Sequence, residues 1–255
     1  MTSGRYIRGD EFSSLAEAHW RNVSGGLALR NMAKRQVSRV SHDGKSYIVK
    51  TYRLGFFRRV LGLRVRSFEC LDCLDGLTPR CVIDRIEGNW QFTVFEDAGG
   101  SDLFKLDYDE PRNPVTLGLF SDAGRLLAEI HGRNVYHGDT KTPNFVVNEN
   151  SPALSPVVIV DCDRLRQYRE LPIMRRAFNL AQFIESAPSW HPVESVVSHL
   201  MAFCRAYRET SSLEDAAWRS LFMLALDIAE NNRHIERMTS DAAIRELRKL
   251  QGIEE

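Results

Sequence analysis

The first part of the chain, from about residue 25 to residue 97, is dominated by short runs in which apolar and polar positions alternate. This period of two is typical of strands that bury one face. Segments 35–40 and 46–53 alternate in this way on either side of Asp43 and Gly44, a residue pair that strongly favours a tight hairpin turn. The pattern therefore predicts an antiparallel hairpin within a small sheet.

Further segments extend this strand-rich part. Residues 26–32 are strand-like, and residues 80–86 and 90–97 form a second hairpin candidate. Between the two hairpins, the apolar residues of segment 56–77 follow a helical spacing that is interrupted at Gly62. We expect this segment to provide the main helix of the strand-rich part.

The rest of the chain has mostly helical periodicity. Segment 113–134 is strongly amphipathic, and nearly everything beyond Pro172 repeats its apolar residues at helical spacing. Two strand-like runs, 145–148 and 157–163, lie between these helical regions. The pattern predicts a helical second half that carries one short hairpin.

We therefore expect one α+β domain with a strand-rich lobe, residues 1–97, and a helical lobe, residues 98–255. Of the 255 residues, 43% are hydrophobic and 27% charged, as in ordinary globular proteins, and the formal net charge of zero gives no sign of a nucleic-acid partner. No apolar stretch follows the amino terminus, and none is long enough to span a membrane. A cytoplasmic location is the resulting prediction.

The strongest motif is the loop YHGDTKTPN at 136–144, which lies between the amphipathic helix and the next strand. It matches H-x-D-x-x-x-x-N, and Asp161 follows at the end of the next apolar run, an arrangement typical of a kinase catalytic loop and its metal-binding aspartate. Asp139 is the candidate proton acceptor and Lys141 the candidate cation for the transferring phosphoryl group. Asn144 and Asp161 are candidate ligands of Mg²⁺, which prefers oxygen donors.

A second group of candidates would bind the nucleotide, ATP. Lys50 is the one lysine inside an apolar strand and would hold the phosphates. Glu69 is the candidate partner of Lys50, and Asp72 is the second choice. Glu96 lies where the two lobes are expected to join, and we expect it to meet the adenine through backbone groups.

No glycine-rich phosphate loop, G-x-G-x-x-G, lies between the first two expected strands. The segment NMAKRQ takes its place, so Lys34 and Arg35 are candidate phosphate contacts. A solvated turn explains the same two residues equally simply.

On these motifs the chain resembles the bacterial lipopolysaccharide kinase family, distant relatives of eukaryotic protein kinases. The resemblance covers about residues 26–186 and rests on Lys50, HGDTKTPN at 137–144, VDCD at 160–163 and RRAFNLAQFIES at 175–186. It implies a two-lobed protein-kinase-like fold with ATP and Mg²⁺ as cofactors. It also implies a sugar hydroxyl of the lipid A–core (Kdo or heptose) as acceptor, at the cytoplasmic face of the inner membrane.

The chain departs from kinase patterns at three positions. Cys162 stands where the family often has phenylalanine, Gly138 replaces a common arginine, and Asn179 stands where protein kinases generally have aspartate. Another small hydroxyl compound as acceptor, a protein Ser/Thr kinase and a pseudokinase that only binds partners therefore remain alternatives. The short segment 163–179, which lacks an A-P-E motif, disfavours the protein kinase.

Segment 55–66, GFFRRVLGLRVR, mixes aromatic and basic residues. Two interpretations are open. In the first, the segment rests on an anionic membrane surface or meets the phosphates of the acceptor. In the second, Phe56, Phe57 and Leu61 pack into the first lobe while the arginines face water.

Overall fold

The computed structural model describes residues 9–65, 69–107, 109–150, 155–231 and 239–250. The chain forms two compact units, Met1–Leu71 with Pro79–Gly99, and Asp72–Thr78 with Gly100–Glu255. The sequence-based division after residue 97 lies close to the change of unit at Gly99. It differs in that Asp72–Thr78 belongs to the second unit.

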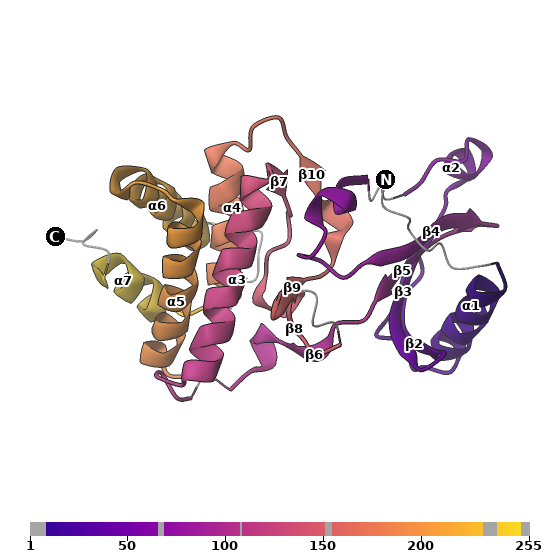
Figure 1. The fold of residues 1–255 in the computed structure, drawn as a ribbon, viewed down its shortest axis with the longest axis horizontal. Coiled ribbons are helices and arrows are strands. Elements are labelled where there is room, and N and C mark those ends of the chain that lie inside the picture. Colours follow the sequence, from indigo (N-terminus) through magenta and orange to yellow (C-terminus); the bar gives the residue numbers. More distant parts are fainter. Residues whose placement is uncertain (1–8, 66–68, 108, 151–154, 232–238, 251–255) are drawn as a thin grey trace. The chain divides into compact units, whose positions relative to one another are not determined.

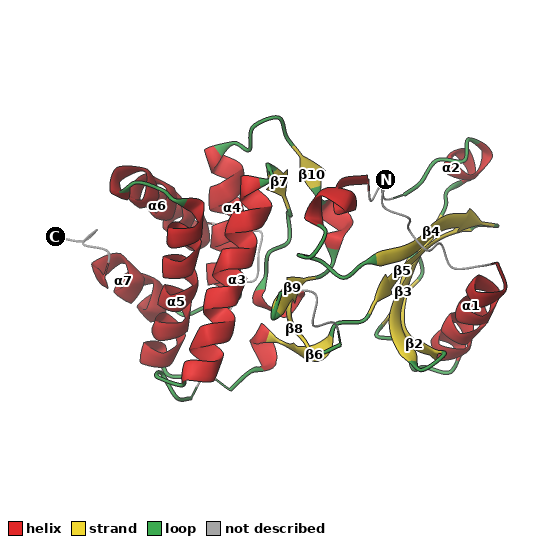
Figure 2. Cartoon of the chain, in the orientation of Figure 1, coloured by secondary structure: helices red, strands yellow, loops and turns green. Residues whose placement is uncertain are grey.

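The first unit is built on a five-stranded antiparallel sheet with the order β1-β2-β3-β5-β4 (Figures 1 and 2). Its strands are β1 (Arg30–Met32), β2 (Arg35–His42), β3 (Lys45–Arg53), β4 (Cys81–Glu87) and β5 (Trp90–Glu96). Both predicted hairpins are confirmed, β2–β3 and β4–β5. The turn between β2 and β3 places Asp43 at φ 49° and Gly44 at φ 73°, and a two-residue hairpin turn with both central residues at positive φ favours Asp-Gly.

The main helix of the first unit is α1 (Gly9–Ser24), which lies along one face of the sheet in Figure 1. Phe12, Leu15 and His19 are its buried side chains, and Phe12 packs edge-on against Phe92 of β5 at 5.3 Å between ring centroids. The His19 ring lies 2.7 Å from the Ser38 hydroxyl on β2. The sequence analysis predicted no helix here, although these three residues share one helical face.

The prediction of a main helix within 56–77 is wrong. In its described residues, 56–65 and 69–77, the segment forms only the five-residue helix α2 (Phe56–Val60) and a 3-10 stretch at Glu69–Leu74. Gly62 interrupts the segment with φ 61°. No side chain of α2 is buried, so α2 lacks the tertiary packing that normally stabilises a helix of marginal length.

The second unit is mainly helical, as predicted. Its helices are α3 (Pro114–Gly132), α4 (Ile173–Glu185), α5 (Val193–Ser211), α6 (Asp215–Asn231) and α7 (Asp241–Leu250). Its strands are β6 (Gly99–Asp102), β7 (Val135–Tyr136), β8 (Phe145–Asn148), β9 (Val157–Ile159) and β10 (Arg166–Gln167). β8 and β9 form the predicted hairpin, and β7 pairs with β10. No helix in the described part of the chain is long and apolar enough to cross a membrane.

The α3–α5 contact is close because α3 carries Gly124 where the helices meet. A Cβ atom at Gly124 would lie 2.2 Å from the carbonyl oxygen of Phe203 on α5. Gly118, in the same helix, has no atom within 4 Å of such a Cβ. The two glycines therefore make a matched pair that separates helix packing from helix propensity.

We expect Gly124→Ala to lower the free energy of unfolding by about 1–3 kcal/mol, because the added methyl group must push the helices apart. Gly118→Ala should instead be neutral or stabilising by up to about 1 kcal/mol, since alanine favours the helix. Urea unfolding followed by circular dichroism measures both. Equal effects of the two substitutions would contradict the close approach.

Candidate active site

The loop 137–144 is held between two short strands of the second unit. It follows β7, which pairs with β10 so that Tyr136 lies opposite Arg166. Gly138 has φ +79°, and a Cβ atom there would lie 3.0 Å from the Cβ of Arg164 and 3.1 Å from the ring of Tyr136. The backbone conformation and the lack of space both require glycine at this position, which explains the departure from arginine.

Polar groups of α4 and of the residue that follows it form hydrogen bonds to the loop 137–144. Gln182 accepts the backbone N–H of Thr140 at 3.2 Å and donates its amide to the Gly138 carbonyl, also at 3.2 Å. The Thr140 hydroxyl donates to the Asn179 carbonyl at 2.6 Å. Ser186, which follows α4, accepts the Thr142 N–H at 2.8 Å. Three of these contacts hold backbone groups of the loop, and the fourth holds the Thr140 side chain.

Asn179 extends this network to two buried histidines. Its side-chain oxygen accepts the backbone N–H of His137 at 3.2 Å and the Nε2–H of His131 at 3.1 Å. The other ring nitrogen of His131 accepts from the Tyr207 hydroxyl at 2.7 Å. Burial lowers the pKa of His131 from 6.5 to about 3, so its ring is neutral at physiological pH and one nitrogen donates while the other accepts.

The two candidate catalytic residues, Asp139 and Lys141, have charged side-chain ends that take no part in the hydrogen bonds of the loop. The Asp139 N–H donates to the His137 ring at 3.3 Å, and the Asp139 carbonyl accepts from the Asn144 amide at 2.8 Å. Both side chains are partly exposed. Among the described residues, neither the carboxylate of Asp139 nor the ammonium of Lys141 makes a hydrogen bond or an ion pair. The loop therefore fixes two charged groups while leaving both available to a ligand.

Asn144 and Asp161 come together across the β8–β9 hairpin. Phe145 pairs with Ile159, and the Val160 N–H donates to the Asn144 carbonyl at 2.8 Å, so Asp161 follows the residue opposite Asn144. Because the Asn144 amide nitrogen donates to the loop, its side-chain oxygen is the atom that remains for a cation. Asp161 adopts φ 58° and ψ 50°, a left-handed conformation that is uncommon outside glycine and often marks functional sites.

The remaining nucleotide candidates belong to the first unit. Lys50 is buried in β3 with 7% exposure, and its ammonium lies 5.4 Å from the centroid of the Phe95 ring. Glu96 ends β5; its carboxylate pairs with Arg80 at 2.7 Å, and its backbone N–H donates to the Arg80 carbonyl. The Glu96 N–H is therefore already hydrogen-bonded. A backbone contact from Glu96 to adenine would have to use the Glu96 carbonyl.

Lys34 and Arg35 lie at the turn between β1 and β2. Met32 pairs with Arg35, so the connection is a two-residue turn rather than an extended loop. Lys34 is exposed, and the Arg35 guanidinium lies 5.6 Å from the centroid of the Tyr52 ring. Glu69 and its alternative Asp72 fall in the 3-10 stretch, and their side chains lie outside the described residues.

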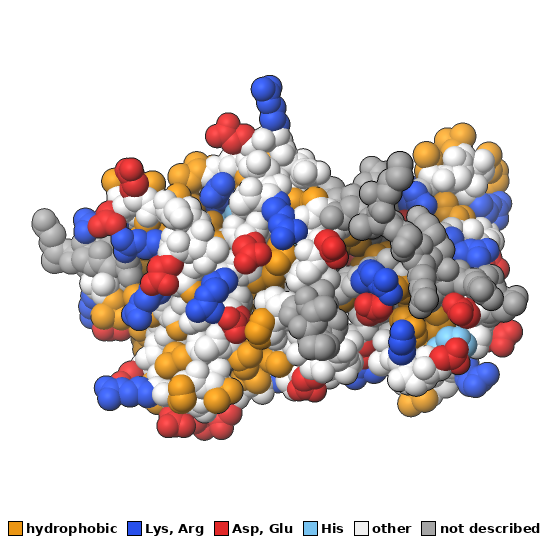
Figure 3. All heavy atoms as spheres, in the orientation of Figure 1, with side chains coloured by type: hydrophobic (Ala, Val, Ile, Leu, Met, Phe, Trp, Pro, Cys, Tyr) orange, Lys and Arg blue, Asp and Glu red, His pale blue; other side chains and the backbone are white. Residues whose placement is uncertain are grey.

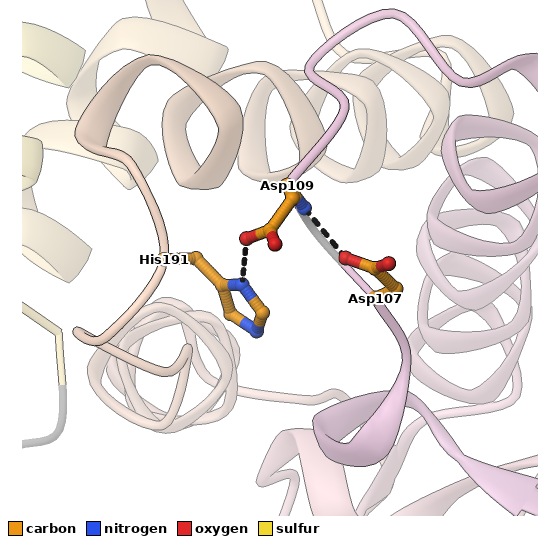
Figure 4. A group of neighbouring side chains, drawn as sticks. All are labelled: Asp107, Asp109 and His191. Carbon is orange, nitrogen blue, oxygen red and sulfur yellow. Dashed lines mark hydrogen bonds and ion pairs between the residues drawn. The ribbon is translucent and has the colours of Figure 1, made fainter.

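A separate cluster in the second unit lies outside the sequence motifs. The side chains of Asp107, Asp109 and His191 approach one another, as Figure 4 shows. The His191 ring pairs with Asp109 at 2.9 Å, and the Asp109 N–H donates to Asp107 at 2.8 Å. These internal contacts account for the arrangement, and we assign no metal to it.

The buried His131 should make the stability of the protein depend on pH. Above pH 6.5 its ring is neutral in both states, whereas between pH 6.5 and about 3 only the unfolded chain binds the proton. Its contribution is therefore complete above pH 6.5 and is lost as the pH falls, by about 1.4 kcal/mol per pH unit. Urea unfolding at neutral pH and at about pH 5 should show a smaller loss for His131→Gln than for the parent chain. An unchanged loss would contradict the assignment.

Comparison with known proteins finds similar solved structures. No family model matches the sequence, and no curated protein matches it. Among solved structures, the chain is similar to WaaP in complex with acyl carrier protein, at 21% sequence identity and a TM-score of 0.49. The alignment covers 79% of this chain and 88% of that chain.

Proposed function

We propose that the chain is an ATP- and Mg²⁺-dependent phosphotransferase with a two-lobed, protein-kinase-like fold. The observation that carries the proposal is the contrast within the loop 137–144. Its backbone is held by α4, β7 and the β8–β9 hairpin, whereas the charged ends of Asp139 and Lys141 make no hydrogen bond or ion pair with the described residues. A transfer site needs fixed charges that are free to meet substrate.

The donor atoms beside this loop fit a magnesium ion. An amide oxygen at Asn144 and a carboxylate at Asp161 are hard oxygen ligands, which Mg²⁺ prefers. Asp161 also adopts a backbone conformation that is costly for most residues, and a hairpin that keeps such a conformation supports a functional role. The bound metal would neutralise charge on the nucleotide phosphates.

The chain's own groups would then act by position and charge. Asp139 would orient the acceptor hydroxyl and accept its proton, and Lys141 would offset the negative charge of the transferring phosphoryl group. Lys50, placed by β3, would bind the nucleotide phosphates. Lys34 and Arg35 are proposed as further phosphate contacts and Glu96 as a neighbour of the adenine. No covalent intermediate on the protein is required.

The acceptor we propose is a sugar hydroxyl of the lipid A–core, Kdo or heptose, at the cytoplasmic face of the inner membrane. This finer proposal is supported by the sequence resemblance carried by Lys50 and the segments 137–144, 160–163 and 175–186. Another small hydroxyl compound is the alternative acceptor, and the assay below separates the two.

A transfer assay with labelled ATP and Mg²⁺ tests the proposal, with lipid A–core from a kinase-deficient strain and a generic protein as acceptors. We expect label in the lipid A–core, and a loss of about 10²–10⁴-fold for Asp139→Ala, because the proton acceptor is removed. Glu149→Gln, which changes an exposed carboxylate elsewhere in the second unit, should leave the rate unchanged. Label in the protein would refute the acceptor, and no metal-dependent ATP binding would refute the phosphotransferase.

Two substitutions at Asp161 separate its backbone strain from its chemistry. Asp161→Gly should unfold with a free energy about 1 kcal/mol higher than Asp161→Ala, because only glycine adopts the left-handed conformation without cost. Both should lose the Mg²⁺-dependent part of the thermal shift that ATP produces. Equal stabilities of the two variants would contradict the backbone assignment, and a retained metal-dependent shift would contradict the metal assignment.

A further inference from the structure

The segment around α2 exposes large apolar side chains that the fold does not use. Phe56, Phe57, Val60 and Leu61 are 65%, 79%, 64% and 66% exposed, and Leu63 is 50% exposed. The interpretation that Phe56, Phe57 and Leu61 pack into the first lobe is therefore wrong. Single exposed apolar residues are common on protein surfaces, but a contiguous group usually marks a contact site.

Arginines stand among these apolar residues, and residues 54–65 contain no acidic residue. Arg64 is neutralised, since it pairs with Asp84 at 2.9 Å. Arg59 lies 2.8 Å from the Asn89 amide oxygen and 5.5 Å from the centroid of the Phe56 ring, and Arg58 donates to the Arg64 carbonyl. Among the described residues, neither Arg58 nor Arg59 contacts a carboxylate. The segment therefore keeps positive charge directly beside its apolar side chains.

Figure 3 shows hydrophobic and basic side chains gathered side by side over α2 at one extremity of the first unit. The Phe56 and Phe57 rings meet edge to face at 5.8 Å between centroids, so the two rings project together. Aromatic and aliphatic side chains flanked by arginine are the composition of segments that lie in the interface of an anionic membrane.

We propose that residues 55–64, hereafter the α2 ridge, dock this protein on an anionic lipid bilayer. Phe56, Phe57, Val60 and Leu61 enter the boundary between headgroups and acyl chains, and the guanidinium groups of Arg58 and Arg59 bind lipid phosphates, for which their planar donors are suited. Charge complementarity selects the lipid surface as the occupant. The docking does not depend on the proposed transfer reaction, although it would bring the loop 137–144 to any acceptor carried by the same membrane.

Co-sedimentation of the full chain with vesicles tests this proposal. One set of vesicles contains phosphatidylcholine alone, and the other adds phosphatidylglycerol. We expect binding to the anionic vesicles that weakens with salt, and a loss of about tenfold or more for F56S/F57S and for R58Q/R59Q. The matched control is L27S/L29S, because Leu27 and Leu29 are also exposed apolar residues of the first unit, at 73% and 62%. This control should bind as the parent does.

Because none of the four changed side chains is buried, the variants should keep the thermal unfolding temperature of the parent chain. Equal binding of parent and F56S/F57S, equal binding to neutral and anionic vesicles, or no binding by the parent would each overturn the proposal. Sedimentation velocity tests a second copy of the chain as the alternative occupant. If the parent forms a dimer that F56S/F57S dissociates, and vesicle binding is unchanged, the ridge serves self-association instead. Phosphate transfer to a soluble acceptor stays independent of all these outcomes.

Discussion

The hydrogen bonds from α4 to the loop 137–144 are the constraint on which the candidate site depends. A loop of this length that carries an aspartate and a lysine has many conformations in isolation, and ordering it costs conformational entropy. Asn179, Gln182 and Ser186 offset that cost by engaging backbone groups of the loop. Their spacing of three and four residues puts them on one face of α4 and its C-cap, so all three support the loop from the same side.

Local signals in the sequence were sufficient for the elements that surround this site. The alternation of β2 and β3 with their Asp-Gly turn, the amphipathic α3 and the β8–β9 hairpin are each encoded within a few residues, and the structure has all of them. The motif spacing also placed Asp139, Asn144 and Asp161 in one region. The proximity of Asn144 to Asp161 follows from the register of the β8–β9 hairpin. The pattern of apolar residues in the two strands helps to set that register.

Tertiary packing decided the features that the sequence did not reveal. Among its residues of described burial, helix α1 buries only Phe12, Leu15 and His19, so its narrow apolar face became evident only against the sheet. Segment 56–77 has the periodicity of a helix, but the side chains of α2 at its start pack on nothing, and this helix stays short. The supporting roles of Gln182 and Ser186 could not be predicted from the loop sequence. Both residues bind backbone N–H groups, which are the same whatever residues the loop contains.

Asn179 has a consequence that reaches beyond geometry. An aspartate at this place would put a permanent negative charge behind the loop, whereas asparagine, glutamine, serine, threonine and the neutral His131 form a support without formal charge. The side chains that hold the loop through α4 therefore add no carboxylate to the two charged side chains that the loop itself carries, Asp139 and Lys141.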